Sequence, residues 1–237
     1  PNPNPDPDPN PNPNPDPNRL TLTLTLTLTL TLLPPQVLAA LKPRVTKGGV
    51  CKGTGALPAG RLDVNGQQID LRESNSWRLK LEDVQMPELV EVMAINTLAP
   101  FILNARLQPL LAATAAEAGC AFIVNVSAME GKFYRHKTAN HPHTNMAKAA
   151  LNMMTRTSAA DLAREHRIYM TAVDTGWIND ENPAARAART AAASHFQTPI
   201  DEVDAAARVL HPVFHGLATD GEPLHGVFLK DFSASEW

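Results

Sequence analysis

Two short runs rich in β-branched residues flank a long helical pattern, and this arrangement restricts the fold more than any other feature of the sequence. The runs are AFIVNVSA at 121–128 and IYMTAVD at 168–174, and the helical pattern extends from about Thr144 to Arg164. Apolar runs of this length are typical of buried parallel strands that a helix connects. Further elements are expected in a helix at 87–113, where Pro100 is expected to introduce a kink, a helix near 200–217 and a last strand at 226–232. The sequence therefore predicts an α/β fold with a parallel sheet of three strands.

Dipeptide repeats make up the start of the chain. Residues 1–18 alternate nine Pro with six Asn and three Asp, and residues 21–32 are six Thr-Leu pairs. Both patterns can be read from one DNA repeat, CCCTAA, in two frames, so we interpret residues 1 to about 33 as a translated repeat. The Pro-Asn tract is expected to be disordered, because alternate residues lack an N–H and nothing apolar is available to bury. The Thr-Leu run has the period of a strand with one Leu face; it could pair with an exposed sheet edge or could have no selected role.

Composition divides the chain into three parts. Residues 1–33 are low-complexity, residues 34–60 are linker-like, and residues 61–237 have the composition of a globular protein. The net charge of −3 resides in residues 1–18, because removing their three Asp from the 24 acidic residues leaves 21, equal to the 21 Lys and Arg of residues 19–237.

This charge balance and the cysteine content exclude several classes of protein. The sequence has no basic patch, so we expect neither nucleic acid nor a membrane as a partner. We also expect no membrane helix, for lack of a ~20-residue apolar run, and no signal peptide. Cys51 and Cys120 do not make a disulfide framework, which favours the cytoplasm.

Four strings in the globular part resemble the second half of short-chain dehydrogenases/reductases. They are INTLAPF (95–101), IVNVSAMEG (123–131), TNMAKAALNMMTRTSA (144–159) and AVDTGW (172–177), and they follow one another in the order of the family. The match is closest to an atypical subgroup that carries HPHTNMAKAALNM. The resemblance covers roughly residues 61–237 and implies the C-terminal half of a doubly wound Rossmann domain. Family members transfer hydride between NAD or NADP and a small-molecule alcohol or carbonyl.

The resemblance assigns catalytic positions that this chain fills only in part. Asn96 stands where the family holds a proton-relay water, and Lys148 stands where a lysine lowers the pKa of a catalytic Tyr four residues earlier. That Tyr position is Thr144 here, and an aliphatic hydroxyl is a much weaker acid than a phenol. The family's Ser position is Ala128, with Ser127 one place early. Ser127 is expected to serve only if the strand end bulges, because adjacent strand residues point to opposite faces.

The loop before Lys148 contains possible replacements for the missing Tyr. Tyr134 could supply the phenol, and His143, His136 or His141 could act as a general acid near neutral pH. These side chains could equally be ordinary loop residues. We predict no metal site, because the H-x-H pair has no carboxylate or Cys partner.

Cofactor contacts are expected on the substrate side of the domain. Lys148, Thr175 and Gly176 occupy positions where the family meets the cofactor, since Gly176 allows close backbone approach. It could equally be an ordinary turn glycine.

The glycine-rich half of a dinucleotide site is not recognisable. Gly49, Gly53 and Gly55 have the family's spacing, but Pro43 breaks the strand that should precede them and Pro58 the helix that should follow. NAD or NADP binding is therefore doubtful even though the family implies it.

Two hypotheses for function follow from these observations. The first is an NAD(P)-dependent oxidoreductase of the short-chain family, truncated and catalytically impaired. The alternative is a non-catalytic remnant that acts as an oligomerisation or scaffolding module. Helices 87–113 and 144–164 resemble the pair through which family members dimerise, so a homo-oligomer is expected in either case.

Overall fold

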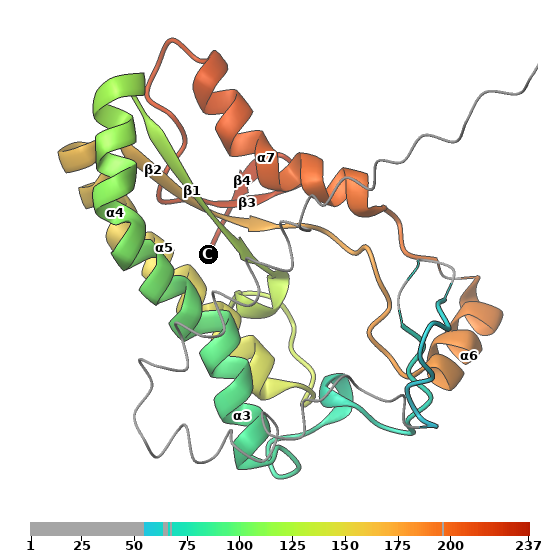
Figure 1. Cartoon of the computed structure of the whole chain (residues 1–237). Helices are drawn as coiled ribbons and strands as arrows, with labels where there is room; N and C mark the ends of the chain where they lie inside the picture. Colours follow the sequence, from blue (N-terminus) through green and yellow to red (C-terminus); the bar gives the residue numbers. More distant parts are fainter. Residues whose placement is uncertain (1–54, 64–65, 67, 196) are drawn as a thin grey trace, which may run out of the picture.

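A single sheet of four strands organises the molecule. The computed structural model describes residues 55–63, 66, 68–195 and 197–237, and the expectations for residues 1–54 lie outside this part of the chain. The strands are β1 (Ala121–Ser127), β2 (Ile168–Asp174), β3 (Phe228–Lys230) and β4 (Ser233–Ser235), in this spatial order (Figure 1). β1, β2 and β3 are parallel, whereas β4 is antiparallel to β3. The predicted α/β fold is confirmed, but the predicted last strand at 226–232 is shorter and corresponds to β3, because the chain turns back through Asp231 and Phe232 at positive φ and continues as β4.

β2 is the centre of the sheet and β1 lies at its edge. All seven residues of β2 are buried, as its unbroken apolar sequence predicts for a strand covered on both faces. β1 instead alternates, with Ala121, Ile123, Asn125 and Ser127 buried and the residues between them more exposed. The difference arises because β2 has a neighbour on both sides, whereas β1 pairs only with β2 among the described residues.

Helices cover both faces of the sheet. α5 (Pro142–His166) and α4 (Ala99–Ala118) pack on one face, and α7 (Glu202–Ala218) contacts β1 and β2 from the other (Figure 1). A stripe of buried small and apolar residues at every fourth position of α5 faces the sheet: Ala147, Leu151, Thr155, Ala159 and Ala163. This spacing places them on one side of a helix, and their small size allows a close approach to β1 and β2.

α4 is the end of a longer continuous helix. It follows α3 (Met86–Met93) and one π-helical turn at Ala94–Leu98, so the helix runs from Met86 to Ala118 and exceeds the predicted 87–113 at both ends. The expected irregularity is present close to Pro100, which has no N–H to donate to the Asn96 carbonyl four residues earlier in this continuous helix. It lies in the π-helical turn just before, which contains Asn96.

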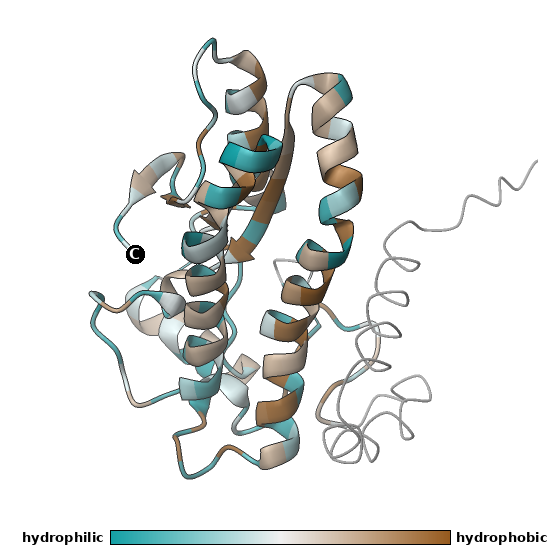
Figure 2. Cartoon of the chain, turned by 90° about the vertical axis from the view of Figure 1, so that its left-hand side faces the viewer, coloured by the Kyte–Doolittle hydropathy of each residue, from teal (hydrophilic) through white to brown (hydrophobic). Residues whose placement is uncertain are grey.

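The same helix corrects the expectation that no segment is long and apolar enough for a membrane helix. Its most apolar 18-residue window has a mean hydropathy of 1.4, so Met86–Ala118 is long and apolar enough to cross a membrane by length and composition. One such helix is weak evidence for a membrane protein, and this one packs against the sheet: the Asn104 amide donates to Asn125 of β1 at 3.0 Å. Only 11% of the window is buried, and Figure 2 shows hydrophobic residues in brown along its length.

Residues before α3 pack beside the segment that follows β2. The turn of 3₁₀ helix at Ser76–Arg78 begins at Asn75, and α6 (Ala184–Ser194) lies beside residues 55–72 (Figure 1). Two hydrogen bonds join the segments: Ala184 N–H donates to the Asp70 carbonyl at 2.7 Å, and the Asn75 amide donates to the Glu181 carbonyl at 2.7 Å.

Candidate functional site

β1 and β2 end side by side, and the residues at and beyond their ends form the candidate site. Ser127, the last residue of β1, lies opposite Asp174, the last residue of β2. The carboxyl ends of parallel strands are where α/β proteins bind their ligands. The candidate residues from the sequence lie in the loops that follow these strand ends or in the helices that pack against them.

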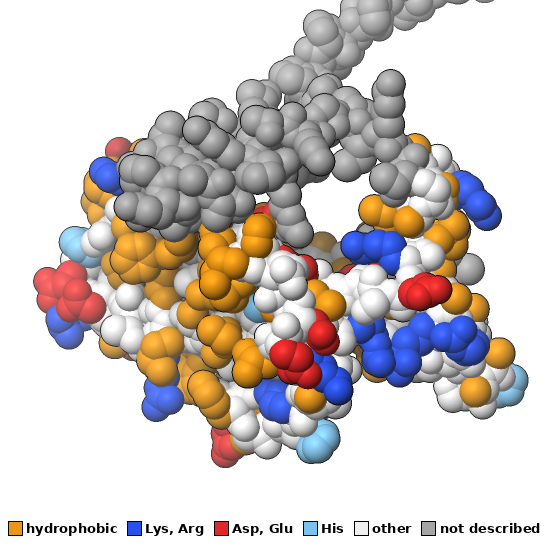
Figure 3. All heavy atoms as spheres, turned by 90° about the horizontal axis from the view of Figure 1, so that it is seen from below, with side chains coloured by type: hydrophobic (Ala, Val, Ile, Leu, Met, Phe, Trp, Pro, Cys, Tyr) orange, Lys and Arg blue, Asp and Glu red, His pale blue; other side chains and the backbone are white. Residues whose placement is uncertain are grey.

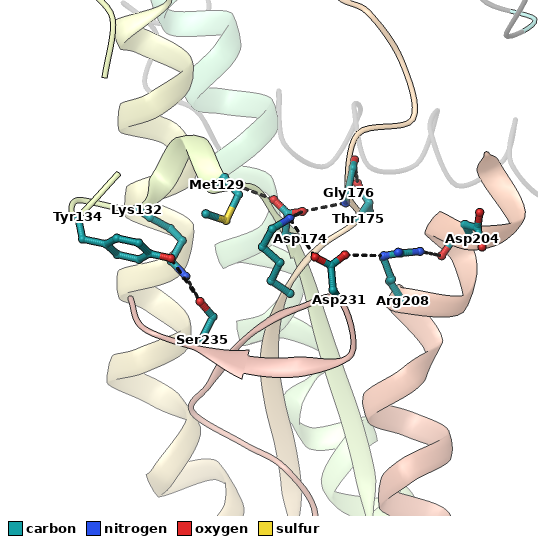
Figure 4. Close-up of polar contacts among 11 residues, drawn as sticks. Met129, Lys132, Tyr134, Asp174, Thr175, Gly176, Asp204, Arg208, Asp231 and Ser235 are labelled. Atoms are coloured by element: carbon teal, nitrogen blue, oxygen red, sulfur yellow. Dashed lines mark hydrogen bonds and ion pairs between the residues drawn. The ribbon is translucent and has the colours of Figure 1, made fainter. Parts of the chain in front are cut away.

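Asp174 is the centre of the polar contacts at this edge (Figure 4). Its carboxylate accepts hydrogen bonds from the N–H groups of Met129 and Gly176, both at 2.8 Å, and from Lys230 Nζ at 3.3 Å. The side chain is 8% exposed, so these donors replace the water that the charge has lost. Asp174 thereby connects the loop after β1, the loop after β2 and the end of β3.

Charged side chains continue from Asp174 to α7. Lys230 Nζ also lies 3.6 Å from Asp231 Oδ2, and Arg208 of α7 approaches Asp231 Oδ1 with its Nε at 3.3 Å. Sequence reasoning missed this set. The available signal was an Asp at the end of an otherwise apolar strand, which needs several donors if it is to be buried.

Lys148 and Asn96 line the same cleft between α4 and β1. Lys148 Nζ donates to the Val126 carbonyl at 3.1 Å, and the Asn96 amide donates to the Val92 carbonyl at 3.1 Å. Burial lowers the pKa of Lys148 below its ordinary value, and the carboxylate of Glu130 partly opposes the shift. The structure therefore brings these two residues to one cavity, with the lysine directed to the backbone of β1.

Gly131 allows the loop after β1 to lie directly on α5. A Cβ at Gly131 would be 2.6 Å from the backbone carbon of Lys148 and 2.8 Å from Ala149 N. These atoms belong to a helix backbone that cannot move aside, so a side chain does not fit here. The glycine therefore sets the distance between the short 3₁₀ turn Met129–Gly131 and Lys148.

Ser127 is directed to α5 rather than to the mouth of the site. Its hydroxyl donates to Asn152 Oδ1, and only 3% of the residue is exposed. The pairing of β1 with β2 continues without a bulge up to Ser127 opposite Asp174. The condition under which Ser127 is expected to serve, a bulged strand end, is absent at this position, while Ala128 follows in extended conformation.

Thr144 and His143 lie in the first turn of α5. His143 is 2% exposed, and its Nε2 lies 3.4 Å from Glu88 Oε1 of α3. Glu88 also accepts a short hydrogen bond from the Ser76 hydroxyl. Thr144 is half-buried. His143 is thus directed to α3.

Tyr134 is directed to the C-terminal strand. Its hydroxyl lies 3.4 Å from Ser235 Oγ, and Lys132 Nζ lies 4.8 Å from its ring centre (Figure 4). Hydrogen bonding with Ser235 and with Lys132 holds the pKa of the Tyr134 phenol below its ordinary value. Lys132 is itself buried, with its Nζ 2.7 Å from Ser235 Oγ and 4.1 Å from the ring centre of Phe228. Among the described residues no hydrogen bond links Tyr134 to Lys148.

Gly176 and Thr175 follow β2, and their polar groups are engaged within the chain. The N–H of Gly176 donates to Asp174, and a Cβ at Gly176, whose φ is +84°, would lie 2.5 Å from Cδ1 of Ile200. The Thr175 hydroxyl donates to the carbonyl of Gly176 at 3.4 Å.

Two positions that the resemblance assigns to the cofactor make contacts within the chain. The space that a missing Cβ leaves at Gly176 is filled by Ile200, and Lys148 binds the backbone of β1. Gly55 lies in a turn, while Gly49 and Gly53 lie outside the described residues.

A larger cavity of about 950 Å³ lies between residues 57–77 and the segment from Asn179 to Thr198. None of the catalytic positions expected from the sequence lines it. Within the part of the chain that the structure describes, no group of three or more His, Cys, Asp or Glu is arranged to hold a metal ion.

Comparisons with known proteins find a matching family model and one similar curated protein. The family model described as "Enoyl-(Acyl carrier protein) reductase" matches residues 60–212. Uncharacterized protein R665 of Acanthamoeba polyphaga mimivirus is 32% identical over 154 residues, which are 63% of this chain and 32% of that protein. The chain thus spans about a third of the length of this curated relative.

Solved structures of carbonyl reductases are similar over part of the chain. The NADPH-bound carbonyl reductase from chicken fatty liver is 22% identical with a TM-score of 0.49, covering 70% of this chain and 64% of that one. The carbonyl reductase Sniffer of D. melanogaster is 21% identical with a TM-score of 0.48, covering 81% of this chain and 71% of that one. Because the family match spans residues 60–212, more than half of the sequence, the chain belongs to the short-chain dehydrogenase/reductase family.

Proposed function

We propose that the chain is an NAD(P)-dependent oxidoreductase by descent, for a small alcohol or carbonyl substrate, with impaired hydride transfer. The observation that carries the proposal is that the side chains at the proton-transfer positions are engaged elsewhere. Lys148 binds the Val126 carbonyl and Ser127 binds Asn152, while the position for a phenol holds Thr144. A compartment with reduced thiols, such as the cytoplasm, suits Cys120, which is free.

The chemistry explains why this arrangement impairs the reaction. Reduction of a carbonyl places negative charge on its oxygen, and an acid must donate a proton to that oxygen as the charge develops. A phenol has a pKa of about 10, which a nearby ammonium lowers, whereas an aliphatic hydroxyl is a far weaker acid. Asn96 and Lys148 keep the positions of the proton relay. Thr144 is too weak an acid to donate the proton that this relay would resupply.

Cofactor titration tests the proposal directly. We expect the purified full chain to show no saturable binding of NADH or NADPH, measured by cofactor fluorescence, and no oxidation of either with small aldehydes and ketones. Saturable binding with turnover that Lys148→Met abolishes would show a competent enzyme and overturn the impairment.

A second variant separates a missing acid from a missing cofactor site. Thr144→Tyr restores the Tyr-x-x-x-Lys spacing, and Thr157→Tyr adds the same side chain at an exposed position of α5. Turnover in Thr144→Tyr but not in Thr157→Tyr would locate the defect in the acid. We expect neither variant to turn over, because Gly176 and Lys148, which the resemblance assigns to the cofactor, are also in contact with other groups of the chain.

The alternative function, a non-catalytic oligomerisation module, is favoured by one observation. Apolar side chains on the α3–α4 helix are exposed: 52% for Ile95, 58% for Phe101 and 65% for Leu110. Figure 3 shows hydrophobic side chains in orange gathered on the lower face of the molecule, where α3 lies. Apolar side chains gathered on an exposed surface are typical of protein contacts.

Sedimentation tests this alternative. If the α3–α4 face mediates self-association, Phe101→Asp lowers the particle mass to that of a monomer. Val203→Asp, which alters a residue 70% exposed on α7, is the matched control and leaves the mass unchanged. A monomeric wild-type chain at micromolar concentration excludes the alternative.

A further inference from the structure

The outer edge of β1 has no neighbouring strand among the described residues. β1 ends the spatial order of the sheet, so its backbone groups on the side away from β2 have no strand to pair with there. Val126 in this strand is 44% exposed, whereas every residue of β2 is buried. An unpaired sheet edge readily accepts an additional strand.

A groove accompanies this edge, and it is the cleft that Lys148 and Asn96 line. It has a volume of about 320 Å³, and apolar residues make up most of its lining: Ile95, Pro100, Leu103, Val124, Val126 and Leu151, beside the polar Asn96, Asn104, Asn125 and Lys148. At one end Lys148 donates to the Val126 carbonyl, so the free stretch of the edge precedes Val126. A strand beside β1 would therefore pair its backbone with the edge and place one row of side chains in the groove.

We propose that the Thr-Leu tract of this same chain, residues 20–33, adds a strand to the outer edge of β1. The tract lies outside the described residues, and its sequence is the basis of the assignment. It alternates Thr and Leu over residues 21–32, so an extended backbone would have Leu on one face and Thr on the other. At twelve residues the repeat is longer than β1, which has seven.

An alternating Thr-Leu strand needs one apolar face and one more polar or exposed face beside it, and the two faces of β1 differ in this way. Asn125 is directed to the helices on one face, where it contacts Asn104 of α4 and Thr155 of α5. Phe122 is directed to the opposite face, where its ring packs on Gly216 of α7. Leu side chains on the first face would meet Ile95 and Leu103. The second face is open near Val126, and Thr suits a half-exposed strand surface.

The chain between the tract and the described residues is long enough to allow this contact. Residues 33 and 55 are separated by 22 residues, which span up to about 70 Å when extended. For comparison, α5 has 25 residues and is about 37 Å long. Intrachain docking also has the advantage of a high effective concentration over a second copy or another protein.

Two matched triple variants of the full chain test the proposal. Leu24→Asp, Leu26→Asp and Leu28→Asp place charges on the Leu face, whereas Thr23→Asp, Thr25→Asp and Thr27→Asp place the same charges on the other face. Hydrogen exchange of the amides in residues 121–125 is measured at two protein concentrations. We expect exchange to be at least about tenfold faster in the Leu variant than in the wild type, and little changed in the Thr variant.

Other results would overturn the proposal. Equal exchange in all three proteins would show that the tract does not lie on the edge, and equal acceleration in both variants would show a general effect of charge. Protection that disappears on dilution would identify a second copy as the occupant.

Disulfide trapping provides a measurement that does not depend on the folding of the Leu variant. In a chain with Cys51→Ser and Cys120→Ser, Leu103→Cys is combined with cysteine at each of residues 22–29 in turn. We expect intrachain disulfide yields that alternate along the tract, high at Leu positions and about fivefold lower at Thr positions. Uniform yields, or disulfides only between chains, would contradict an intrachain strand.

Discussion

β1 and β2 are adjacent strands of equal length, yet they are held in different ways. β2 is buried along its whole length and ends in Asp174, whose carboxylate has three donors from three segments. β1 has an open outer edge among the described residues, and the carbonyl of Val126 is met by Lys148. β2 is therefore paired on both sides by described strands, whereas β1 can still pair with one more strand on its outer side.

The difference also bears on function. A lysine that serves a proton relay must face the reacting groups, but Lys148 is directed to the strand edge. A strand on the free stretch of this edge would end next to the Val126 carbonyl that Lys148 binds. The state of the edge and the state of the candidate site are therefore coupled through one side chain.

The largest expected effect comes from breaking the anchor of β2. Asp174→Ala leaves the N–H groups of Met129 and Gly176 and the ammonium of Lys230 without their acceptor. We expect the free energy of unfolding in urea to fall by about 4 kcal/mol. Asp174→Asn keeps the shape and one acceptor, and should cost about half as much. A loss below about 1 kcal/mol for Asp174→Ala would show that this end of β2 is held by packing alone.

Gly131→Ala tests whether the end of β1 is anchored as firmly as that of β2. The new Cβ would overlap the backbone of Lys148 at 2.6 Å, and we expect a loss of about 2–3 kcal/mol in the same measurement. Gly221→Ala is the control, because its Cβ would meet only a Thr219 side chain at 3.7 Å. Equal stability of the two variants would indicate that the loop moves away from α5 freely.

Paired valine truncations compare the two strands themselves. Val173 of β2 is 1% exposed and Val126 of β1 is 44% exposed. We expect Val173→Ala to cost about 2 kcal/mol and Val126→Ala about 0.5 kcal/mol, since only the first leaves a cavity. A Val126→Ala effect as large as that of Val173→Ala would mean that another segment covers the edge of β1, and would support the strand proposal.

A small, pH-dependent effect is expected from Asp70, whose carbonyl accepts a hydrogen bond from Ala184 at the start of α6. A bidentate contact with Arg72 lowers the pKa of Asp70 from 3.8 to about 2. Because the pKa in the folded state is the lower one, the ion pair stabilises the protein above pH 3.8 and this contribution is lost as the pH falls towards 2. Arg72 is 48% exposed, so water screens the pair and we expect at most about 1 kcal/mol. The difference in unfolding free energy between the wild type and Asp70→Asn should be present at pH 6 and vanish near pH 2; an unchanged difference would contradict the assignment.

Much of the fold could be predicted because its signals are local. The run at 168–174 coincides with β2, and the Ala- and Met-rich pattern identifies α5 to within two residues at each end. Periodicity and propensity depend on neighbours along the chain, so they are readable without a structure. The turn that separates β3 from β4 was missed, since Asp231 and Phe232 adopt positive φ in a segment that otherwise has the pattern of one strand.

The candidate site was less predictable because the partners of each group are distant in sequence. The sequence identified Asn96 and Lys148 as neighbours by resemblance, and both line one cleft. It gave no indication that Tyr134 contacts Ser235, a residue 101 positions away, or that Asp174 contacts Lys230, 56 positions away. Such contacts depend on how helices and strands pack, which no local pattern encodes.

By itself, the sequence determined the α/β class, the order of the helices and strands and the family resemblance, because all three reside in periodicity and in short strings. Only the tertiary structure decided that Ser127 is directed to Asn152, that Lys148 binds the edge of β1 and that Asp174 joins three segments. The physical reason is that a buried polar group takes whichever donor or acceptor the packing brings within hydrogen-bond distance. The identity of that partner is a property of the assembled sheet and helices.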